Sequence, residues 1–526
     1  VTIPNKPSRI AGAECPERSV VSGADHAAAM SVQEYLEKHL LPRKIEEAVN
    51  AAVRAKAADP VLFISTHMRR AAPAVITRVC ARQILDSRGA PAVEVDLHTN
   101  KAVHRASAAG PGAPEGAAVD ATRDVEKRRL LAKAVADSVR LINGKVSEAL
   151  VGMDPQQQAQ IDQAIMDLDK AHHRTEVGAN AMLAVSIAAC KAGAAEKEVP
   201  LYKHIADLVG KSATTLPVPA ITVINGGTHA GNNLPIQEIM ILPIGAKNFE
   251  EAMQMGSETY HHLKDIIWEK YGSDSCNIGD DGGFAPNISS ITEGLDLVIA
   301  AIDRAGYNGR IKLAIDAAAT DFCVGKKYDL EFKSAKKSGQ NFKTGDDMIE
   351  IYSQLCSEYP LVSIEQPFDK DDWEHSKKFT TLELCQVPIV LFIFYLLSGA
   401  HAIMHLQVVG DDLLMSDPER IKRAVNEYTC DALTLKASQV GTVTEAIEAV
   451  KQAKDAHWGV MVSHRSGDTD DSFIADLAVG AAAGQIKAGA PCRGECLTKY
   501  NQLLRIEEEF GSEGVYAGEN WRTTAS

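Results

Sequence analysis

Four short apolar runs decide the fold, VVGD (408–411), LTLK (433–436), MVSH (461–464) and GQIK (484–487), and each ends in an ionisable residue. Their last residues are 25, 28 and 23 positions apart, about the length that a strand and its crossover helix need. Two earlier runs, LAID and VSIE, end in the same way at Asp316 and Glu365. The repeat predicts a closed (β/α)8 barrel, in which the carboxyl ends of the strands meet at one face.

The residues that end these runs predict one pocket with metal-dependent chemistry. Any one of them could be a charge that faces water at the end of a strand, but a series of six is harder to explain in that way. The six residues are Asp316, Glu365, Asp411, Lys436, His464 and Lys487. Three carboxylates without a Cys or His trio are hard oxygen ligands, so Mg2+ is the expected ion. A cation beside Lys436 and Lys487 would lower their proton affinity, and such a lysine can remove a proton from a carbon next to a carboxylate. The alternative is that both lysines are surface residues at helix starts.

Two further motifs add polar groups to this picture. SHRSG (463–467) offers the Arg465 guanidinium, the Ser466 hydroxyl and backbone amides at an expected helix start, which suits a phosphate group. VINGGTHAG (223–231) places His229 in a glycine-rich loop, and Glu238 opens the next apolar run. The alternative for the glycine-rich loop is a simple turn without a functional role.

The chain before the barrel predicts a cap and a helical front end. Residues 80–107 read as two strands around a turn, and helical segments follow, which indicates an α+β cap. Further upstream, Ser31 begins a capping box, and Ile45, Val49 and Val53 continue an apolar stripe. The helices resemble the docking-and-dimerisation helix pair of protein-kinase-A regulatory subunits over residues 32–68. The alternative is a helical hairpin that packs on its own chain.

Composition excludes several classes of protein. The 526 residues are 45% apolar and 24% charged, which is typical of a globular protein of two or three domains. With 55 Lys and Arg against 70 Asp and Glu, the net charge is -15, so we expect no nucleic-acid or membrane partner. The ten cysteines form no paired framework, and residues 1–29 contain no signal-peptide core. We therefore expect a cytoplasmic protein with a disordered segment at residues 1–29.

Across about four-fifths of its length the chain resembles enolase, the phosphopyruvate hydratase of glycolysis, and in particular the plant form with an N-terminal extension. The motifs that carry the resemblance occur in family order: ARQILDSRG, GANAMLAVS, PVPAITVINGGTHAG, GDDGGFAPNI, KLAID, VSIEQPF, VVGDDLL, TLKASQVGT, SHRSGDT, IKAGAPCRGE and NQLLRIEEE. The resemblance implies an N-terminal α+β domain at residues 78–212, an enolase-type barrel at 213–520 and a homodimer. The helical extension occupies residues 30–72.

The resemblance also implies roles for single residues. Asp316, Glu365 and Asp411 match the Mg2+ ligands, and Lys436 matches the base that removes the C2 proton of 2-phosphoglycerate. Asp281 stands where the family has a glutamate that helps to expel the C3 hydroxyl. Matches to substrate-contact positions are His229, Glu238, His464, Arg465, Ser466 and Lys487. Glu94 and Arg505 match an ion pair between subunits.

The chain departs from the enolase pattern at several positions. Gly110 occupies the place of a loop serine that reaches a second magnesium. Asp281 is one methylene shorter than the family's glutamate, which predicts a rate loss of up to about 100-fold. Gln366 and Ser438 are unusual neighbours of Glu365 and Lys436.

An apolar segment interrupts the barrel at residues 387–407. Its uninterrupted apolar run, 387–397, is too short to cross a bilayer. Without the segment, the interval from Glu365 to Asp411 shrinks to 25 residues, which equals the next interval. Because the codons of Val387 and Gln407 can carry the boundary bases of an intron, we hypothesise that the segment is an unspliced intron.

The sequence therefore predicts a Mg2+-dependent lyase that interconverts 2-phosphoglycerate and phosphoenolpyruvate, with reduced activity. The alternative from another class is a catalytically weak, dimeric docking or scaffold module that acts through a helix-bound protein partner. A third hypothesis, another α-proton-abstracting enzyme of the same superfamily, is disfavoured by the phosphate-like SHRSG motif.

Overall fold

The computed structural model describes residues 31–109, 125–168, 178–210, 215–334, 342–382, 384 and 405–522. The chain divides into two compact units, residues 1–73 and 74–526. The segment at 1–29 that we expect to be disordered, the loop position Gly110 and most of the apolar segment at 387–407 lie outside the described residues.

The first unit consists of three short helices, α1 (Val32–Lys38), α2 (Leu41–Ala55) and α3 (Pro60–Ala71). The capping box predicted at Ser31 is present, and a second cap begins α3. Helix α2 packs on α3, but Ala48 and Ala52 are the only buried residues among those described in this unit. Ile45, Val49 and Val53 of the predicted apolar stripe are 46%, 41% and 70% exposed. One copy of the unit therefore leaves most of its apolar surface in water.

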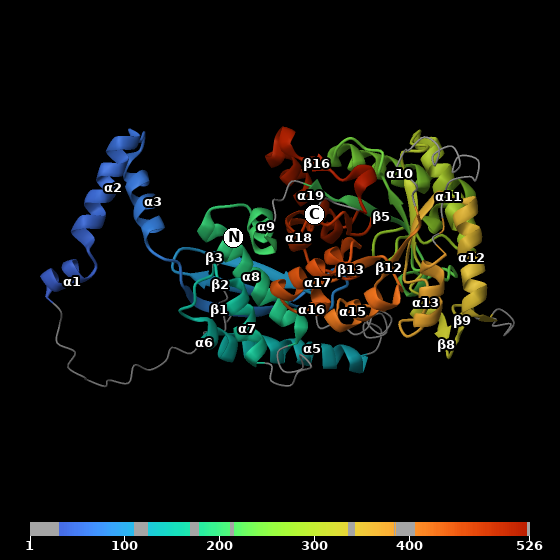
Figure 1. The fold of residues 1–526 in the computed structure, drawn as a ribbon, viewed down its shortest axis with the longest axis horizontal. Helices are drawn as coiled ribbons and strands as arrows, with labels where there is room; N and C mark the ends of the chain where they lie inside the picture. The colour runs from blue at the N-terminus through green and yellow to red at the C-terminus, as the bar shows by residue number, and fades with distance from the viewer. Residues whose placement is uncertain are drawn as a thin grey trace, which may run out of the picture. The chain divides into compact units, whose positions relative to one another are not determined.

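The second unit is built around a closed barrel of eight strands (Figure 1). Around the barrel the strands follow the order β11-β12-β13-β14-β15-β5-β6-β7. Because helices cover the outside and side chains fill the inside, the strands are buried on both faces and read as continuous apolar runs. The strands are β5 (Val218–Asn225), β6 (Glu238–Leu242), β7 (Lys312–Asp316), β11 (Leu361–Glu365), β12 (Gln407–Gly410), β13 (Ala432–Leu435), β14 (Gly459–Ser463) and β15 (Gln485–Lys487).

One strand runs against the others. β6 pairs antiparallel with both β5 and β7, whereas the remaining neighbours in the barrel are parallel. The reason is that residues 226–237 join β5 to β6 with only a short 3-10 turn, η2 (Gly227–His229), and no crossover helix. The amino end of β6 therefore lies at the face where the other strands end.

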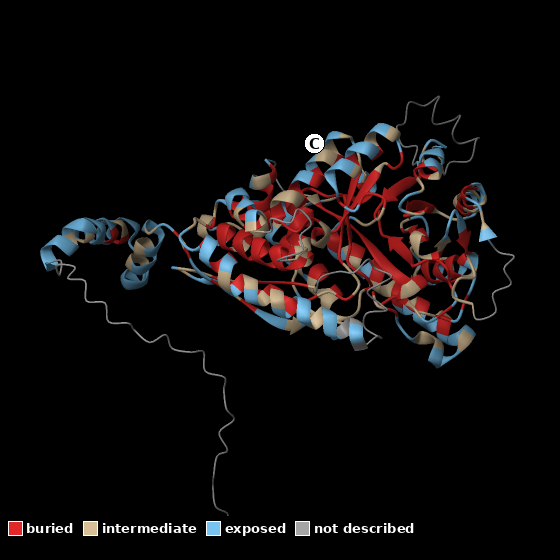
Figure 2. Ribbon diagram, turned by 90° about the horizontal axis from the view of Figure 1, so that it is seen from below, coloured by how far each residue is buried: buried red, intermediate tan, exposed pale blue. Residues whose placement is uncertain are grey.

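Helices with polar caps surround the barrel. Asn248, Ser290, Thr344, Asp417 and Thr442 each accept a backbone N–H at the start of a helix. Buried residues concentrate in the strands and on the inner helix faces, and the outer helix faces are exposed (Figure 2). The helices are α10 (Phe249–Tyr271), α11 (Ile291–Ala305), α12 (Gly345–Glu358), α13 (Trp373–Thr380), α15 (Pro418–Glu427), α16 (Ala437–Val440), α17 (Val443–Asp455), α18 (Phe473–Gly480) and α19 (Gly494–Phe510).

The predicted α+β cap is present, but its sheet is an antiparallel meander of three strands where the pattern over residues 80–107 predicted two. Its strands are β1 (Ile76–Leu85), β2 (Pro91–Thr99) and β3 (Val103–Ala108). Its helical segments are α5 (Val125–Leu141), the π-helix η1 (Ile142–Val146), α6 (Ser147–Leu150), α7 (Gln158–Leu168), α8 (Ala179–Lys197) and α9 (Leu201–Val209). The alanine-rich α8 is almost wholly buried because it contacts β2 and β3 of the cap as well as α16 and α17 of the barrel. It therefore joins the cap to the barrel.

Short elements complete the second unit. One small sheet contains β8 (Cys323–Val324), β9 (Lys327–Asp329) and β10 (Phe342–Lys343). A second small sheet pairs β4 (Thr215–Leu216) with β16 (Val515–Tyr516). The remaining 3-10 turns are η3 (Ser273–Cys276), η4 (Ala319–Phe322), η5 (Gly511–Glu513) and η6 (Gly518–Asn520). Gln407, the last residue of the apolar segment, is already part of β12 and pairs with Ser363 of β11.

Candidate active site

Three buried carboxylates gather at the carboxyl face of the barrel. Asp316 and Glu365 end β7 and β11 in the same register, and Asp411 directly follows β12. One oxygen from each residue lies within 4.8 Å of the other two, and all three residues are buried. The strand-end pattern thus correctly placed these side chains at one point. Three hard oxygen donors at this spacing fit a divalent cation.

Two buried lysines neutralise part of this negative charge. The Lys487 Nζ lies 2.8 Å from the Asp316 Oδ2 and 2.6 Å from the Glu365 Oε2. The Lys436 Nζ lies 2.6 Å from the Asp411 Oδ2. Burial by itself would lower the pKa of Lys487, but the surrounding carboxylates hold this pKa well above its usual value. The protein's own charges therefore act against the lower proton affinity that we expected beside a cation.

Burial raises the pKa of both strand-end carboxyls that contact Lys487. For Asp316 and Glu365 the loss of hydration is the largest cause, and Lys487 opposes it. A cation bound by these carboxylates would offset the free-energy cost of their lost hydration.

A second buried group lies beside the carboxylates. His229, Glu238 and Asp281 have one polar atom each within 4.8 Å of one another. The antiparallel direction of β6 brings Glu238 here, because it pairs in register with Asp316 of β7. Glu238 has a raised pKa because it is buried, although Lys487 opposes this shift.

Asp281 is the centre of a hydrogen-bond network. Its carboxylate lies 2.7 Å from the His229 Nδ1, accepts the Ser466 hydroxyl at 2.6 Å and accepts the Asn225 amide at 3.2 Å. Burial would raise the pKa of Asp281, but His229 and the Ser466 hydroxyl hold it well below the usual value. Burial also lowers the pKa of His464 to about 4, so this imidazole is neutral at pH 7.

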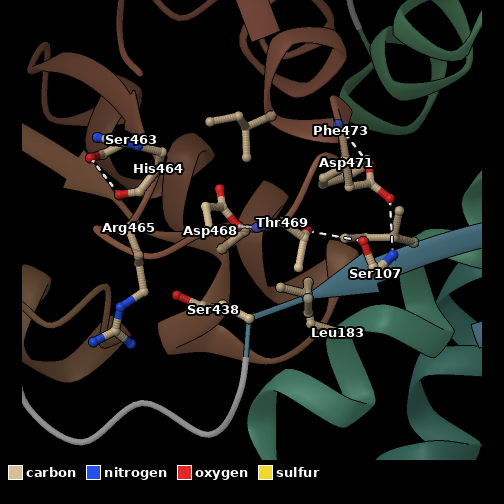
Figure 3. A pocket seen from close by; sticks show the side chains of 15 residues that line it. Ser107, Leu183, Ser438, Ser463, His464, Arg465, Asp468, Thr469, Asp471 and Phe473 are labelled. Atoms are coloured by element: carbon tan, nitrogen blue, oxygen red, sulfur yellow. Dashed lines mark hydrogen bonds between the residues drawn. The ribbon is translucent and has the colours of Figure 1, made fainter. Parts of the chain in front are cut away.

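The residues predicted to contact or convert the substrate divide between two adjoining pockets, and the three clustered carboxylates line neither of them. His229, Glu238, Asp281, Lys436, His464, Ser466 and Lys487 line one of them. The second pocket lies where β3 of the cap meets the loop after β14, and it shares Ser463 and His464 with the first. Arg465 lines only the second pocket, where Figure 3 shows it on the side away from Ser107. Ser107 is hydrogen-bonded there to Thr469 and Asp471.

Several supporting side chains were missed at the sequence level. Thr434 donates to the Glu365 Oε1 at 2.7 Å, and Thr222 donates to the Glu238 Oε2 at 3.0 Å. Gln366, which the sequence already marked as an unusual neighbour of Glu365, donates to the Asp412 Oδ2 at 2.8 Å. The available signal was a threonine inside an apolar run, in LTLK and in AITVIN.

The two residues expected at a subunit contact have partners within the chain. Glu94 forms an ion pair with Arg82 and lies 3.6 Å from Arg105. Arg505 donates to the Gln502 Oε1 at 3.4 Å.

The described part of the chain contains no helix that is long and apolar enough to cross a membrane.

Fold and site together define a barrel enzyme with a capping domain and a carboxylate cluster that could hold a metal ion. Residues 76–205 match the family model "Enolase, N-terminal domain", and residues 213–391 and 395–525 match "Enolase, C-terminal TIM barrel domain". The chain belongs to the enolase family. It is a lyase with phosphopyruvate hydratase activity, and nothing in the comparisons favours the scaffold alternative.

Two curated relatives are similar over most of the chain. Cytosolic enolase 3 of Arabidopsis thaliana is 62% identical over 495 residues, which cover 94% of this chain and 99% of the relative. Enolase of Solanum lycopersicum is 51% identical over 460 residues, which cover 85% of this chain and 98% of the relative. This chain therefore contains segments beyond the tomato protein, and its helical first unit precedes both family-model matches.

Proposed function

We propose that this enolase uses Mg2+, held by Asp316, Glu365 and Asp411. The observation that carries the proposal is the convergence of three buried carboxylates within 4.8 Å. Oxygen donors without cysteine or imidazole suit Mg2+ better than zinc or copper. When bound, Mg2+ would stabilise the negative charge that develops on the substrate carboxylate.

Lys436 is the base in this proposal. It follows β13 at the carboxyl face and contacts Asp411, so its amine lies beside the carboxylates that would hold the cation. A neutral Lys436 takes the C2 proton of 2-phosphoglycerate. Lys487, which contacts Asp316 and Glu365, remains charged and attracts the substrate carboxylate.

The C3 hydroxyl leaves as water and needs a proton. Because its neighbours hold the Asp281 carboxyl ionised, we assign proton delivery to the hydrogen-bonded pair of His229 and Asp281 instead of Asp281 alone. Glu238 contributes a carboxyl beside this pair. Neutral His464 orients the substrate, and Arg465 and Ser466 contact its phosphate.

Phosphoenolpyruvate formation tests these roles. We expect Lys436→Ala to lower kcat at saturating Mg2+ at least about 100-fold, because the base is lost. Lys422→Ala, which changes an exposed lysine on α15, is the matched control. Calorimetric Mg2+ titration of Asp411→Asn should show weakened binding. Wild-type kcat in Lys436→Ala would refute the base, and unchanged Mg2+ affinity in Asp411→Asn would refute the ligand set.

We further infer a homodimer in which a second copy of the chain covers the helical unit. The unit leaves Ile45, Val49 and Val53 exposed and buries only two of its described residues, too few for a core of its own. If Glu94 and Arg505 join two barrels, the tethered helices gain a high effective concentration for pairing. The compartment proposed for this dimer is the cytoplasm, supported by the name of the Arabidopsis relative.

Sedimentation of the full chain tests the dimer. We expect Val49→Glu, on the apolar stripe, and Arg505→Glu to weaken self-association most when combined. Asn50→Glu, which places the same charge on an exposed neighbour, should sediment as the wild type does. If Val49→Glu and Asn50→Glu behave alike, the helical unit does not pair with a second copy.

A further inference from the structure

We propose that Asp321 and Lys333 are positioning residues for His229, which they hold through its two neighbours in the chain. Thr228 donates its hydroxyl to the Asp321 Oδ2 at 2.9 Å. On the other side, the Lys333 Nζ donates to the carbonyl oxygen of Ala230 at 2.8 Å. The loop that carries His229 is therefore fastened at both flanking residues, and both fastenings come from the segment that follows β7.

This anchoring segment is itself fixed to the metal centre. It begins directly after Asp316, whose Oδ1 accepts the backbone N–H of Ala318 at 2.9 Å. Thr320, next to Asp321, accepts the Gln366 amide at 2.9 Å, and Gln366 directly follows Glu365. The segment thus links two strand ends of the carboxylate cluster to the His229 loop.

Aromatic packing makes the segment a firm support. The ring of Phe322, adjacent to Asp321, lies 6.1 Å from that of Tyr328 and 6.0 Å from that of Phe332, adjacent to Lys333. Tyr328 also packs edge-on against Phe368, at 6.2 Å. Both anchors therefore lie next to rings of one aromatic cluster.

Lys333 is partly buried where its amine meets the His229 loop. Burial lowers its pKa to about 8. Within the described residues its polar contacts are the Ala230 carbonyl and, at 3.5 Å, the Asn232 Oδ1. Asn232 in turn donates to the Asn225 carbonyl at 2.9 Å, which ties the same loop back to β5.

The consequence concerns the geometry of the His229–Asp281 pair. His229 reaches Asp281 through a single 2.7 Å contact of its Nδ1, so a small shift of the loop would break it. Misplacement of a catalytic group by about 1 Å can cost about 100-fold in rate. This inference rests on the role proposed above for His229.

Steady-state kinetics of the full-length enzyme separates positioning from folding. We expect Thr228→Val, which removes the hydroxyl and keeps the shape, to lower kcat about 10-fold with KM within about twofold. Thr228→Ser should restore kcat. Lys333→Met should lower kcat to a similar extent, whereas Lys326→Met, at an exposed lysine of the same segment, should not. The melting temperature and Mg2+ affinity should stay at wild-type values.

His229→Asn separates the proposed role of His229 from the positioning role of Asp321 and Lys333. If His229→Asn keeps wild-type kcat, the proposed role of His229 is wrong. If it loses activity while Thr228→Val and Lys333→Met do not, the positioning inference is overturned. A kcat loss in Lys326→Met equal to that in Lys333→Met would also overturn it. Should Thr228→Val fail to fold, the comparison of Lys333→Met with Lys326→Met decides the question.

Discussion

Replacement of Thr434 by valine tests how the barrel orients Glu365, one of the proposed metal ligands. Thr434 is fully buried in β13 and donates its hydroxyl to the Glu365 Oε1 at 2.7 Å, while Lys487 holds the other oxygen at 2.6 Å. Valine has nearly the same shape, so packing around the position changes little. What the variant loses is one hydrogen bond to a buried carboxylate.

The size of this loss follows from the chemistry of the bond. A hydrogen bond to a charged group contributes about 1.5–3 kcal/mol. Without it, the Glu365 carboxylate has to be ordered when the cation binds, so we expect Mg2+ affinity to fall roughly 10- to 100-fold. Each factor of ten in affinity corresponds to about 1.4 kcal/mol of binding free energy, so this range agrees with the contribution of one such hydrogen bond.

Isothermal titration of Mg2+ into the metal-free protein measures the effect directly. Thr434→Ser, which keeps the hydroxyl and removes only a methyl group, is the control and should bind Mg2+ with near wild-type affinity. If Thr434→Val binds as tightly as the wild type, Thr434 does not orient Glu365. Equal weakening in both variants would point to packing as the cause.

The remaining predictions concern pH dependence and the apolar segment. Burial raises the pKa of Asp476 to about 7, so the folded state keeps this proton as pH rises and loses stability above the ordinary carboxyl pKa. The free energy of unfolding of Asp476→Asn, measured by chemical denaturation, should therefore gain on that of the wild type by about 1.4 kcal/mol per pH unit from pH 4 to pH 7, and a pH-independent difference would contradict this reasoning. Deletion of residues 387–407 leaves Gln386 before Val408, and should preserve β12 and phosphoenolpyruvate formation; an inactive, folded deletion variant would show that the segment is needed.

Much of the site was predictable because the ends of the barrel strands can be recognised in the sequence as apolar runs that stop at an ionisable residue. Short apolar runs that stop at Asp316, Glu365 and Lys487 predict one barrel face, and the structure brings these side chains into contact. Arg465 shows the limit of this reasoning. SHRSG predicts a cation beside the phosphate, but the spacing of residues in the motif does not decide which of two adjoining pockets the Arg465 side chain lines.

The contacts of Asp281 could not be predicted because they join separate parts of the chain. The sequence indicates that Asp281 is shorter than the residue it replaces. Only the fold shows that Ser466, His229 and Asn225, from three different places, meet its carboxylate. These partners, and not the length of the side chain alone, govern its pKa.

The amino-acid sequence by itself predicted the repeat of strands and helices in the barrel and the carboxylates and lysines that gather at its carboxyl face, because burial and side-chain alternation act locally along the chain. The tertiary structure alone decided that β6 runs in reverse and brings Glu238 beside Asp316, and that Thr434, Asp321 and Lys333 support the reacting groups. Such contacts depend on how the barrel closes and how its loops pack, and closure joins residues whose separation in the chain carries no information about their distance in space.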